Sequence, residues 1–592
     1  MKKREILFWA IAALLIFYFF LAFGVFTFLR QEEGQLFIPT WPRLQDQLRQ
    51  VGGCCAIAGQ AIVQYYRMPM VAVAVHTLLA LTLGLSVYRL LQGIRRADYN
   101  LPLALFPVFI VLKMSVRASY LVDGTITLAL MALAALPLLR WRTGRAIALY
   151  GVCATLLLYA IAGPLALCFA PLYALATALL HAGDGRRAQG AWSVLPAVAC
   201  YLLGPRWGVP VSLAEGFRPE EYVEIQALPD AYIYYKVGLL CVALWAGALL
   251  ASFLLARLDN GSRWRSVGLT AVCLLGAIGL GRYSLPDTLD IQNRMADEVA
   301  YLARERQWDA LARRFRGKEM RDYISLNYLN MALAQKGQLA ESMFTFDQRG
   351  TKSLVTPWNQ TFFVSKMLCD VHFHIGDLAL AESYAMDAMA QAKRGGSAWM
   401  LRRLAQINLL RGEWEVARKY IRLLAEMPLY RAWARKAEGY IGHPERMEND
   451  PELRGKTLPP TRTDQLFGLM TTEALWSSHP AGSIGWEYLG CHYLLAKDLP
   501  GFRAFIEASG ARELPRHFQE AWLIANDTPD SSALHPAIRP EIARRYEQLR
   551  ELLSIRSASD VDMRAVYQTF GDTYWFYYYF KIFQDPTNTN AR

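Results

Sequence analysis

Apolar segments recur throughout the first half of the chain, and this feature constrains the fold more than any other. Between Ile6 and Gly281 these segments are about 20 residues long, which is the length that a helix needs to cross a bilayer. From about Asp287 onward, charged residues occur every few positions and no apolar segment is long enough to span. We therefore expect an all-α protein, with a polytopic transmembrane bundle over 1–283 and a soluble helical domain over 284–592. The bundle is expected to have about nine spans, at residues 6–29, 69–92, 101–116, 119–139, 146–162, 164–182, 190–204, 235–256 and 265–282.

The first apolar segment is interpreted as a membrane span and not as a cleaved signal peptide. It is too long, and it runs into Arg30 and Gln31 without the small residues of a cleavage site. The nine cysteines lie mostly within apolar segments, there is no C-x-x-C motif, and the adjacent Cys54 and Cys55 are poorly placed to bond to each other. Neither a disulfide framework nor a structural zinc site is expected, and these residues predict no resident cofactor.

Lysine and arginine are distributed unevenly among the loops between the spans. They concentrate in alternate loops, and the cytoplasmic loops of membrane proteins carry such an excess. The pattern predicts a multi-pass protein of the bacterial inner membrane, with a cytoplasmic N-terminus and, after an odd number of spans, a periplasmic C-terminal domain. It also accounts for much of the net charge of +12, so no nucleic-acid partner is expected. The basic residues that carry the pattern are Lys2, Lys3, Arg4, Arg89, Arg95, Arg96, Arg140, Arg142, Arg145, Arg186, Arg187, Arg257, Arg263 and Arg265.

Two loops on the opposite side are too long to be simple turns. They cover residues 30–68 and 205–234. The first contains a stretch of helical character over 44–66 that is interrupted by two glycines. The second contains Arg218 and ends in a tyrosine cluster of the kind found at membrane interfaces.

Three ionisable residues, Lys113, Arg117 and Asp123, flank the connection between the third and fourth expected spans. Ionisable groups at membrane depth are costly and tend to mark a cavity or a pathway. The alternative is that the two basic side chains extend toward the membrane surface while Asp123 begins a turn. The sequence leaves both interpretations open.

The soluble half contains a repeated pattern, in which a glycine is followed by an apolar residue two positions later and a small residue five positions later. It occurs at Gly337, Gly376 and Gly412, with spacings of 39 and 36 residues, close to the tetratricopeptide period. A weaker copy lies at 496–502. Glycine permits the left-handed backbone that connects two antiparallel helices. We therefore expect a tetratricopeptide-like α-solenoid, clearest over 320–440, which would offer an extended surface to a protein or peptide partner.

The ends of this array can also be predicted. Helices over 289–315 and beyond 460 are expected to extend or cap the stack, whereas residues 443–464 are rich in proline and charge and predict a loop. The aromatic stretch at 572–580 is typical of a helix that docks on a domain core, and the alternative is that it lies on a membrane surface or a partner.

Several phrases of the sequence resemble an uncharacterised family of polytopic inner-membrane proteins from Bacteroidota. They are residues 30–37 (RQEEGQLF), 51–66, 514–521 (LPRHFQEA) and 573–578 (TYWFYY). The resemblance extends over nearly the whole chain. It implies a helical-repeat C-terminal domain and an inner-membrane location, but no established activity.

The architecture is also similar, more distantly, to the GT-C class of polytopic glycosyltransferases, which use sugars linked to polyprenyl phosphate. In that class a large first outer loop carries an acidic site, usually Asp-Asp or Asp-Glu. The resemblance implies that Glu32 or Glu33 is the first-loop acid and Asp123 the acid between spans three and four. It further implies that Lys113 or Arg117 contacts the lipid phosphate, and it allows a divalent metal ion at the acids.

The sequence therefore supports two hypotheses about function. In the first, the protein is not an enzyme, and its periplasmic repeats bind an envelope protein or peptide in a scaffold or assembly role. In the second, it is a glycosyltransferase of the GT-C kind, whose candidate catalytic residues are Glu32, Glu33 and Asp123. The candidate substrate-binding residues are then Lys113, Arg117 and Arg218.

Overall fold

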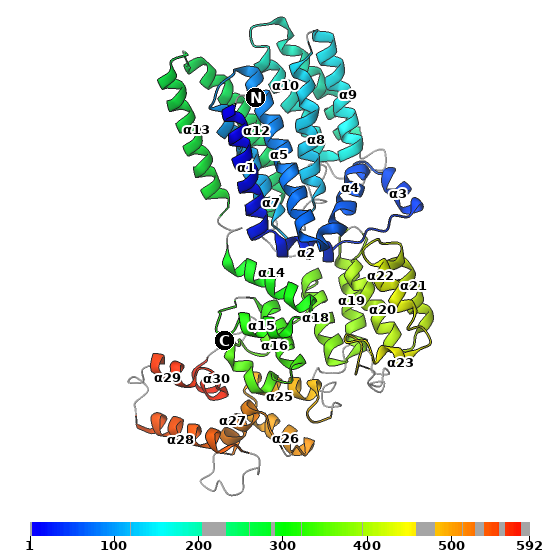
Figure 1. Ribbon diagram of the computed structural model, residues 1–592, viewed down its shortest axis with the longest axis vertical. Helices are drawn as coiled ribbons and strands as arrows, with labels where there is room; N and C mark the ends of the chain where they lie inside the picture. Colours follow the sequence, from blue (N-terminus) through cyan, green and yellow to red (C-terminus); the bar gives the residue numbers. More distant parts are fainter. Residues whose placement is uncertain are drawn as a thin grey trace. The chain divides into compact units, whose positions relative to one another are not determined.

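The computed structural model of the chain is all-α in the part that it describes, with one isolated parallel bridge between Gln35 and Lys393 (Figure 1). The chain forms two compact units. Unit 1 consists of Met1–Arg294, Ala392–Trp399 and Arg422–Arg435, and unit 2 of Met295–Gln391, Met400–Ile421 and Lys436–Arg592. The structure describes residues 3–118, 120–141, 143–203, 232–259, 261–285, 290–320, 322–393, 395–456, 480–511, 513–526, 538–555 and 563–581.

Unit 1 is built from apolar helices, several of which are long enough to cross a membrane. Within the described residues, five helices meet this condition by length and composition. Shorter apolar helical segments cover Asn100–Ser115, Asp123–Leu139 and Pro164–Leu180. The prediction of several helices that are long and apolar enough to span a membrane is confirmed, while the count of nine spans is not established. The five long helices are α1 (Lys3–Phe23), α5 (Pro69–Ile94), α9 (Gly144–Ala162), α12 (Tyr232–Leu258) and α13 (Arg263–Ser284).

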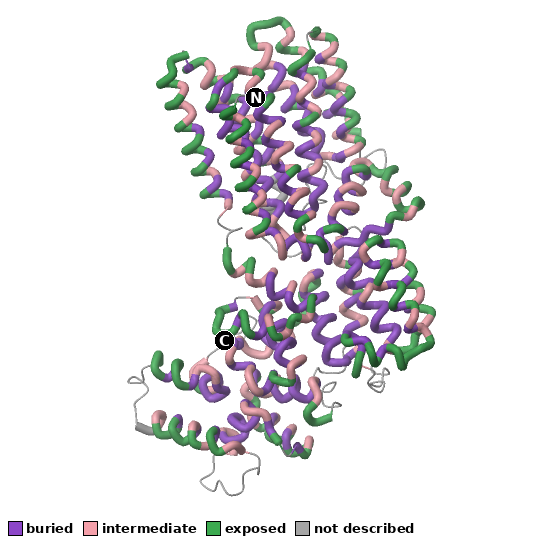
Figure 2. Tube along the Cα trace, viewed as in Figure 1, coloured by how far each residue is buried: buried purple, intermediate pink, exposed green. Residues whose placement is uncertain are grey.

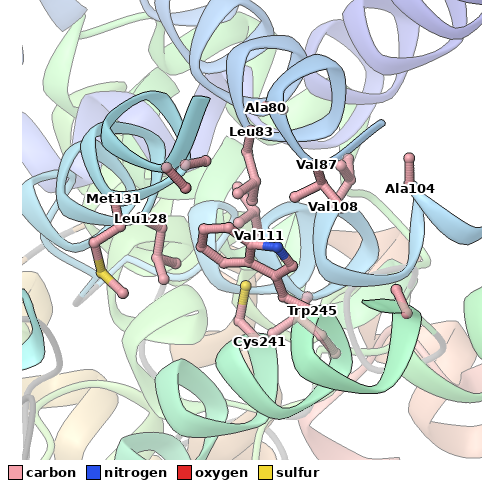
Figure 3. Packing of buried hydrophobic residues seen from close by; sticks show 14 of the residues in the cluster. Ala80, Leu83, Val87, Ala104, Val108, Val111, Leu128, Met131, Cys241 and Trp245 are labelled. Atoms are coloured by element: carbon pink, nitrogen blue, oxygen red, sulfur yellow. The ribbon is translucent and has the colours of Figure 1, made fainter. Parts of the chain in front are cut away.

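The core of unit 1 lies where α5 and α12 meet two shorter helices, α7 (Phe106–Ser115) and α8 (Asp123–Ala135). Trp245 of α12 is 1% exposed and packs among aliphatic side chains from the other three helices (Figure 3). By contrast, α1 and α13 leave many large apolar side chains exposed, as helices that face lipid do. The other apolar helices of unit 1 are α6 (Asn100–Leu103), α10 (Phe169–Leu180) and α11 (Val194–Leu203).

The segment after α1 forms three further helices before α5 begins. The first, α2, continues to Glu33. Residues 30–33 therefore form the end of a helix, whereas the sequence predicts a loop at these positions. The predicted interruption of the next helical stretch is confirmed, because α3 ends at Leu48 and Gly52 adopts a left-handed conformation (φ 83°). The backbone N–H of Gly52 donates to Ala160 of α9 at 3.0 Å, which ties this segment to the bundle. The helices are α2 (Val25–Glu33), α3 (Trp41–Leu48) and α4 (Gly53–Val63), followed by a 3-10 turn at Gln64–Arg67.

Unit 2 is dominated by pairs of antiparallel helices that are joined by tight turns. The predicted glycines Gly337, Gly376 and Gly412 all have left-handed backbones, with φ of 62°, 102° and 76°. After each of them the next residue donates its N–H to the carbonyl five positions earlier, at 2.8–2.9 Å. This bond closes the end of the helix in the Schellman manner. The paired helices are α14 (Ile291–Arg304) and α15 (Trp308–Arg314), α16 (Tyr323–Gln335) and α17 (Leu339–Ser342), α18 (Phe362–Ile375) and α19 (Leu378–Gln391), and α20 (Ala398–Leu410) and α21 (Trp414–Ala425).

The same turn occurs at two places without glycine. Arg306 (φ 54°) joins α14 to α15, and Lys497 (φ 58°) joins α25 to α26, at the position of the weak copy of the pattern. A helix pair over 289–315 is thus confirmed, and α18 is buried along almost its whole length (Figure 2). Within 443–464 there is one short helix, α23 (Pro444–Met447), and residues 457–464 lie outside the described part. Beyond it follow α25 (Ile484–Ala496), α26 (Leu499–Ser509), α27 (Arg516–Ala525), α28 (Pro540–Ile555), α29 (Met563–Phe570) and α30 (Tyr574–Phe580), while α22 (Arg431–Glu438) precedes it.

The aromatic stretch near the C-terminus docks on the core of unit 2, as expected. Tyr574 and Trp575 of α30 are fully buried. The indole N–H of Trp575 donates to the backbone carbonyl of Glu520 at 2.9 Å. The prediction of a docked helix at 572–580 is therefore confirmed.

Candidate functional site

The last turn of α2 places three polar side chains inside unit 1. Gln31, Glu32 and Glu33 are only 2–3% exposed, so the acidic pair is not a solvated helix end. The amide of Gln31 donates to the backbone carbonyls of Ser115 at 2.9 Å and Arg117 at 2.7 Å. Since these carbonyls lie at the end of α7 and two residues beyond it, the amide fixes the acidic turn of α2 against the connection between α7 and α8.

Two segments that come much later in the sequence complete the surroundings of this turn within unit 1. The hydroxyl of Tyr430 donates to Oε1 of Glu32 at 2.7 Å. The hydroxyl of Ser397 donates to the backbone carbonyl of Glu33. The guanidinium of Arg67 lies 5.5 Å from the centre of the Tyr430 ring and also donates to the carbonyl of Leu429. The orientation of Glu32 thus depends on a residue 398 positions away.

Asp123 is the first residue of α8 and is 4% exposed. It lies directly against Gly59 of α4, where an added Cβ would come within 3.3 Å of Asp123 Oδ1. A side chain at position 59 would therefore require Asp123 or α4 to shift by a few tenths of an ångström. The pKa of the buried Tyr66 hydroxyl lies well above its usual value. Burial is the main cause, and electrostatic repulsion by Tyr120 and Asp123 adds smaller contributions.

The predicted basic residues Lys113 and Arg117 lie in the segment that Gln31 of α2 contacts. Lys113 lies in the last turn of α7 and Arg117 two residues after its end, and both side chains are half-buried. Arg218 lies outside the described residues. The elements that carry Glu33, Lys113 and Asp123 thus meet at one end of the apolar helices.

A metal site does not emerge from these acids. Among the residues that the structure describes, no group of three or more His, Cys, Asp or Glu side chains is close enough to hold a metal ion. Glu32, Glu33 and Asp123 therefore do not form a group of this kind.

Unit 2 contains a pocket that the sequence did not indicate. Its volume is about 970 Å³, and it lies between the turn after α16, the start of α25 and the start of α27. The buried carboxyl group at its wall is Glu487, the one acidic residue in the otherwise apolar helix α25. A lone acid in such a helix is the signal that could have identified it. The residues that line the pocket are Gly337, Glu341, Ala481, Gly482, Trp486, Glu487, Ala511, Glu513, Leu514, Pro515, Gln519 and Arg539.

A second group of buried charges in unit 2 is fully paired. Asp370 on α18 accepts from Lys366 at 2.9 Å and from Arg403 of α20 at 3.0 Å. Arg403 also pairs with Glu452 at 3.2 Å and lies 3.9 Å above the ring of Phe373. Burial alone would raise the pKa of Asp370, but the charges of Lys366 and Arg403 lower it to about 2. Such a network orders the core and needs no ligand.

Comparison with known proteins places this chain in a family. The model of a family of unknown function, DUF6057, matches residues 1–581. The chain belongs to the DUF6057 family. No curated protein and no solved structure matches it. The expectation of an uncharacterised family is therefore confirmed for nearly the whole length of the chain.

For this DUF6057 protein, the residues at the end of α2 define what chemistry is available. A carboxylate shielded from water can accept a proton from a bound hydroxyl group. Half-buried cations such as Lys113 and Arg117 can bind a phosphate group.

Proposed function

We propose that this protein transfers a sugar from a polyprenyl-phosphate donor to an acceptor at the α2 end of the membrane-spanning bundle. One observation carries the proposal: Glu32, Glu33 and Asp123 are each less than 5% exposed on elements that meet beside apolar helices. Burying a carboxylate next to a membrane interior is costly, and ionisable residues in such places are by default functional candidates. The distant similarity to GT-C glycosyltransferases supports the same assignment.

The proposed reaction uses the side chains in separate roles. Glu33 removes the proton of the acceptor hydroxyl as its oxygen bonds to the anomeric carbon of the sugar. The bond between that carbon and the lipid phosphate breaks, and the departing phosphate is held by Lys113 and Arg117. Asp123 orients the acceptor. Glu32 is held by Tyr430 and sets the position of the turn.

The membrane arrangement that fits this proposal has nine spans, with the N-terminus in the cytoplasm of a Bacteroidota cell. The reaction then takes place at the outer face of the inner membrane. The helical unit, a tetratricopeptide-like array, lies in the periplasm. The alternation of basic loops supports this orientation. Cysteine-accessibility labelling of single-cysteine variants from each side of the membrane tests it.

The transferase proposal is tested by genetic complementation. A deletion strain is complemented with wild type, Glu33→Gln or Asp123→Asn, and envelope glycans are profiled by mass spectrometry. Glu33→Gln should lower transfer by about 100-fold or more, because it removes a general base while preserving size. Glu507→Gln, which changes an exposed carboxylate on α26, is the control and should behave like wild type. Equal amounts of protein in the membrane are verified by immunoblot. Unchanged glycans in the deletion strain would refute the proposal.

A second candidate function is supported by unit 2. We propose as the alternative that this unit binds an envelope protein in a scaffold or assembly role. The specific observation in its favour is the pocket of about 970 Å³ among its helices, which is at the upper end of the size of ligand sites, roughly 300–1,000 Å³. Quantitative co-purification from detergent should recover one stable envelope partner. A chain that purifies alone after cross-linking in cells would contradict this alternative.

A further inference from the structure

The pocket in unit 2 has an unusual wall, because its most buried acidic group lacks a full set of partners. Glu487 is 8% exposed, and one of its carboxyl oxygens has no hydrogen-bond partner among the described residues. The carboxyl group accepts hydrogen bonds from the backbone N–H groups of Leu339 and Ala340. Buried carboxyl groups are normally satisfied on both oxygens, so this one points to a missing ligand.

The other side chains of the wall make the pocket acidic. Glu341 accepts from the backbone N–H of Arg516 at 3.0 Å and pairs with the guanidinium of Arg539. This pairing neutralises Arg539, the basic side chain among the described residues that line the pocket. Glu513 is exposed at the rim, and together with Glu487 it leaves the lining with an excess of negative charge.

An aromatic surface lies next to the buried acid. Trp486 is 3% exposed, lines the pocket, and its indole N–H has no partner among the described residues. Its ring is fixed by contacts with Phe505 and Phe518, with ring centres 5.6 and 5.1 Å apart. An aromatic ring beside a carboxylate is a common arrangement for holding an organic cation.

We infer that this pocket binds a lysine side chain presented by a segment of polypeptide, with the ammonium group directed at Glu487 and the aliphatic part lying along Trp486. A polypeptide is favoured over a small amine, because a pocket of about 970 Å³ is far larger than an isolated ammonium compound needs. The inference does not depend on sugar transfer. It goes beyond the scaffold alternative by naming the group that is recognised.

The experiment measures direct binding to the full-length protein in detergent. The probe is a fluorescein-labelled heptapeptide with one central lysine among alanine and glycine residues, and fluorescence anisotropy reports its affinity. A matched peptide has norleucine in place of lysine. The lysine peptide should bind about tenfold or more tightly than the norleucine peptide, because a buried charge pair is lost. Equal affinity of the two peptides would overturn the inference.

Substitutions in the protein locate the binding site. Glu487→Gln should weaken binding of the lysine peptide by about tenfold or more, whereas Glu507→Gln should leave it unchanged. Ala481 lies exposed at the rim and offers a second pair of variants in case Glu487→Gln fails to fold. Ala481→Lys should weaken binding and Ala481→Glu should strengthen it. Affinities that do not respond to either substitution at Ala481 would exclude this pocket.

The source of the cation and the pH dependence complete the test. Free lysine amide should bind at least about tenfold more weakly than the peptide, since it lacks the contacts of the flanking backbone. Equal affinity would show a small-amine site instead.

Burial raises the pKa of Glu487 to about 7. The lysine peptide should therefore bind about tenfold more tightly at pH 8 than at pH 6, and this change should vanish in Glu487→Gln.

Discussion

Two of the buried carboxyl groups of unit 2, those of Asp370 and Glu487, differ in their surroundings. Asp370 is 4% exposed and contacts two cations, Lys366 and Arg403. Glu487 is 8% exposed, and its partners among the described residues are backbone N–H groups. The pKa of Asp370 falls to about 2, because the two cations outweigh burial, whereas burial raises the pKa of Glu487 to about 7. Burial alone therefore does not tell a structural acid from a binding site, and the partners decide it.

The largest effect is expected from breaking the paired network. Asp370→Leu should lower the free energy of unfolding of unit 2 by about 3–5 kcal/mol, because it removes the buried carboxylate that Lys366 and Arg403 share and leaves Arg403 with Glu452 as its counter-charge. Thermal unfolding of the full chain in detergent, followed by tryptophan fluorescence, measures the loss.

A matched control exists on the surface. Arg503 and Glu507 form a pair with the same sequence spacing as Lys366 and Asp370, at 2.8 Å against 2.9 Å, but about half of each side chain is exposed. Glu507→Leu should therefore cost about 1 kcal/mol or less. Similar losses for Glu507→Leu and Asp370→Leu would show that burial of the network contributes nothing.

The second prediction concerns the pH dependence of stability. The folded-state pKa of Glu487, about 7, lies above its usual value of 4.5, so its contribution is present at low pH and is lost as pH rises through 7. Over that interval the cost reaches about 3 kcal/mol. Asp370 has the opposite sign, because its folded-state pKa of about 2 lies below the usual 3.8, and its contribution is lost only as pH falls through 2.

Chemical denaturation at pH 5 and pH 8 separates the two groups. Wild type should lose up to about 3 kcal/mol between these values relative to Glu487→Gln, in which no carboxyl group titrates at this position. Asp370 is ionised at both pH values and should not contribute to the difference. Parallel pH curves for wild type and Glu487→Gln would show that this carboxyl group is ordinary.

Features of the fold that depend on neighbouring residues could be predicted from the sequence, whereas features that depend on residues far away in the chain could not. The apolar helices and the turns at Gly376 and Gly412 follow from local composition, and they were predicted. The same turn at Lys497 was visible only as a weak copy, because its left-handed backbone is supported from afar. Its ammonium group donates to the carbonyls of Tyr578 and Lys581, at 2.8 and 2.6 Å.

The candidate sites show the same limit. Glu32 and Glu33 could be singled out as a pair, but their burial depends on Ser397 and Tyr430, which no sequence pattern connects to them. Glu487 was not singled out, because the backbone that it contacts comes from α17, about 150 residues earlier. Local patterns predict elements, whereas the state of a buried charge is decided by the elements that pack around it.

Glu341 lies between these two cases and is expected to show the smallest effect. It has partners, as Asp370 does, but its side chain is 34% exposed. Glu341→Gln keeps an oxygen that can accept from the N–H of Arg516, at the start of α27, and loses only the charge. The free energy of unfolding should therefore fall by about 0.5–1 kcal/mol at low salt, and by less at high salt because exposed charges are screened. Urea denaturation at two ionic strengths measures this difference.

The same variant also tests the assignment of charges in the pocket. Because Arg539 neutralises Glu341, the Glu341→Gln substitution should change the affinity for the lysine peptide far less than Glu487→Gln does. A decrease as large as that of Glu487→Gln would mean that the ammonium group is bound at the opposite wall, beside Arg539. Glu341, and not Glu487, would then be the acid that binds the ammonium group.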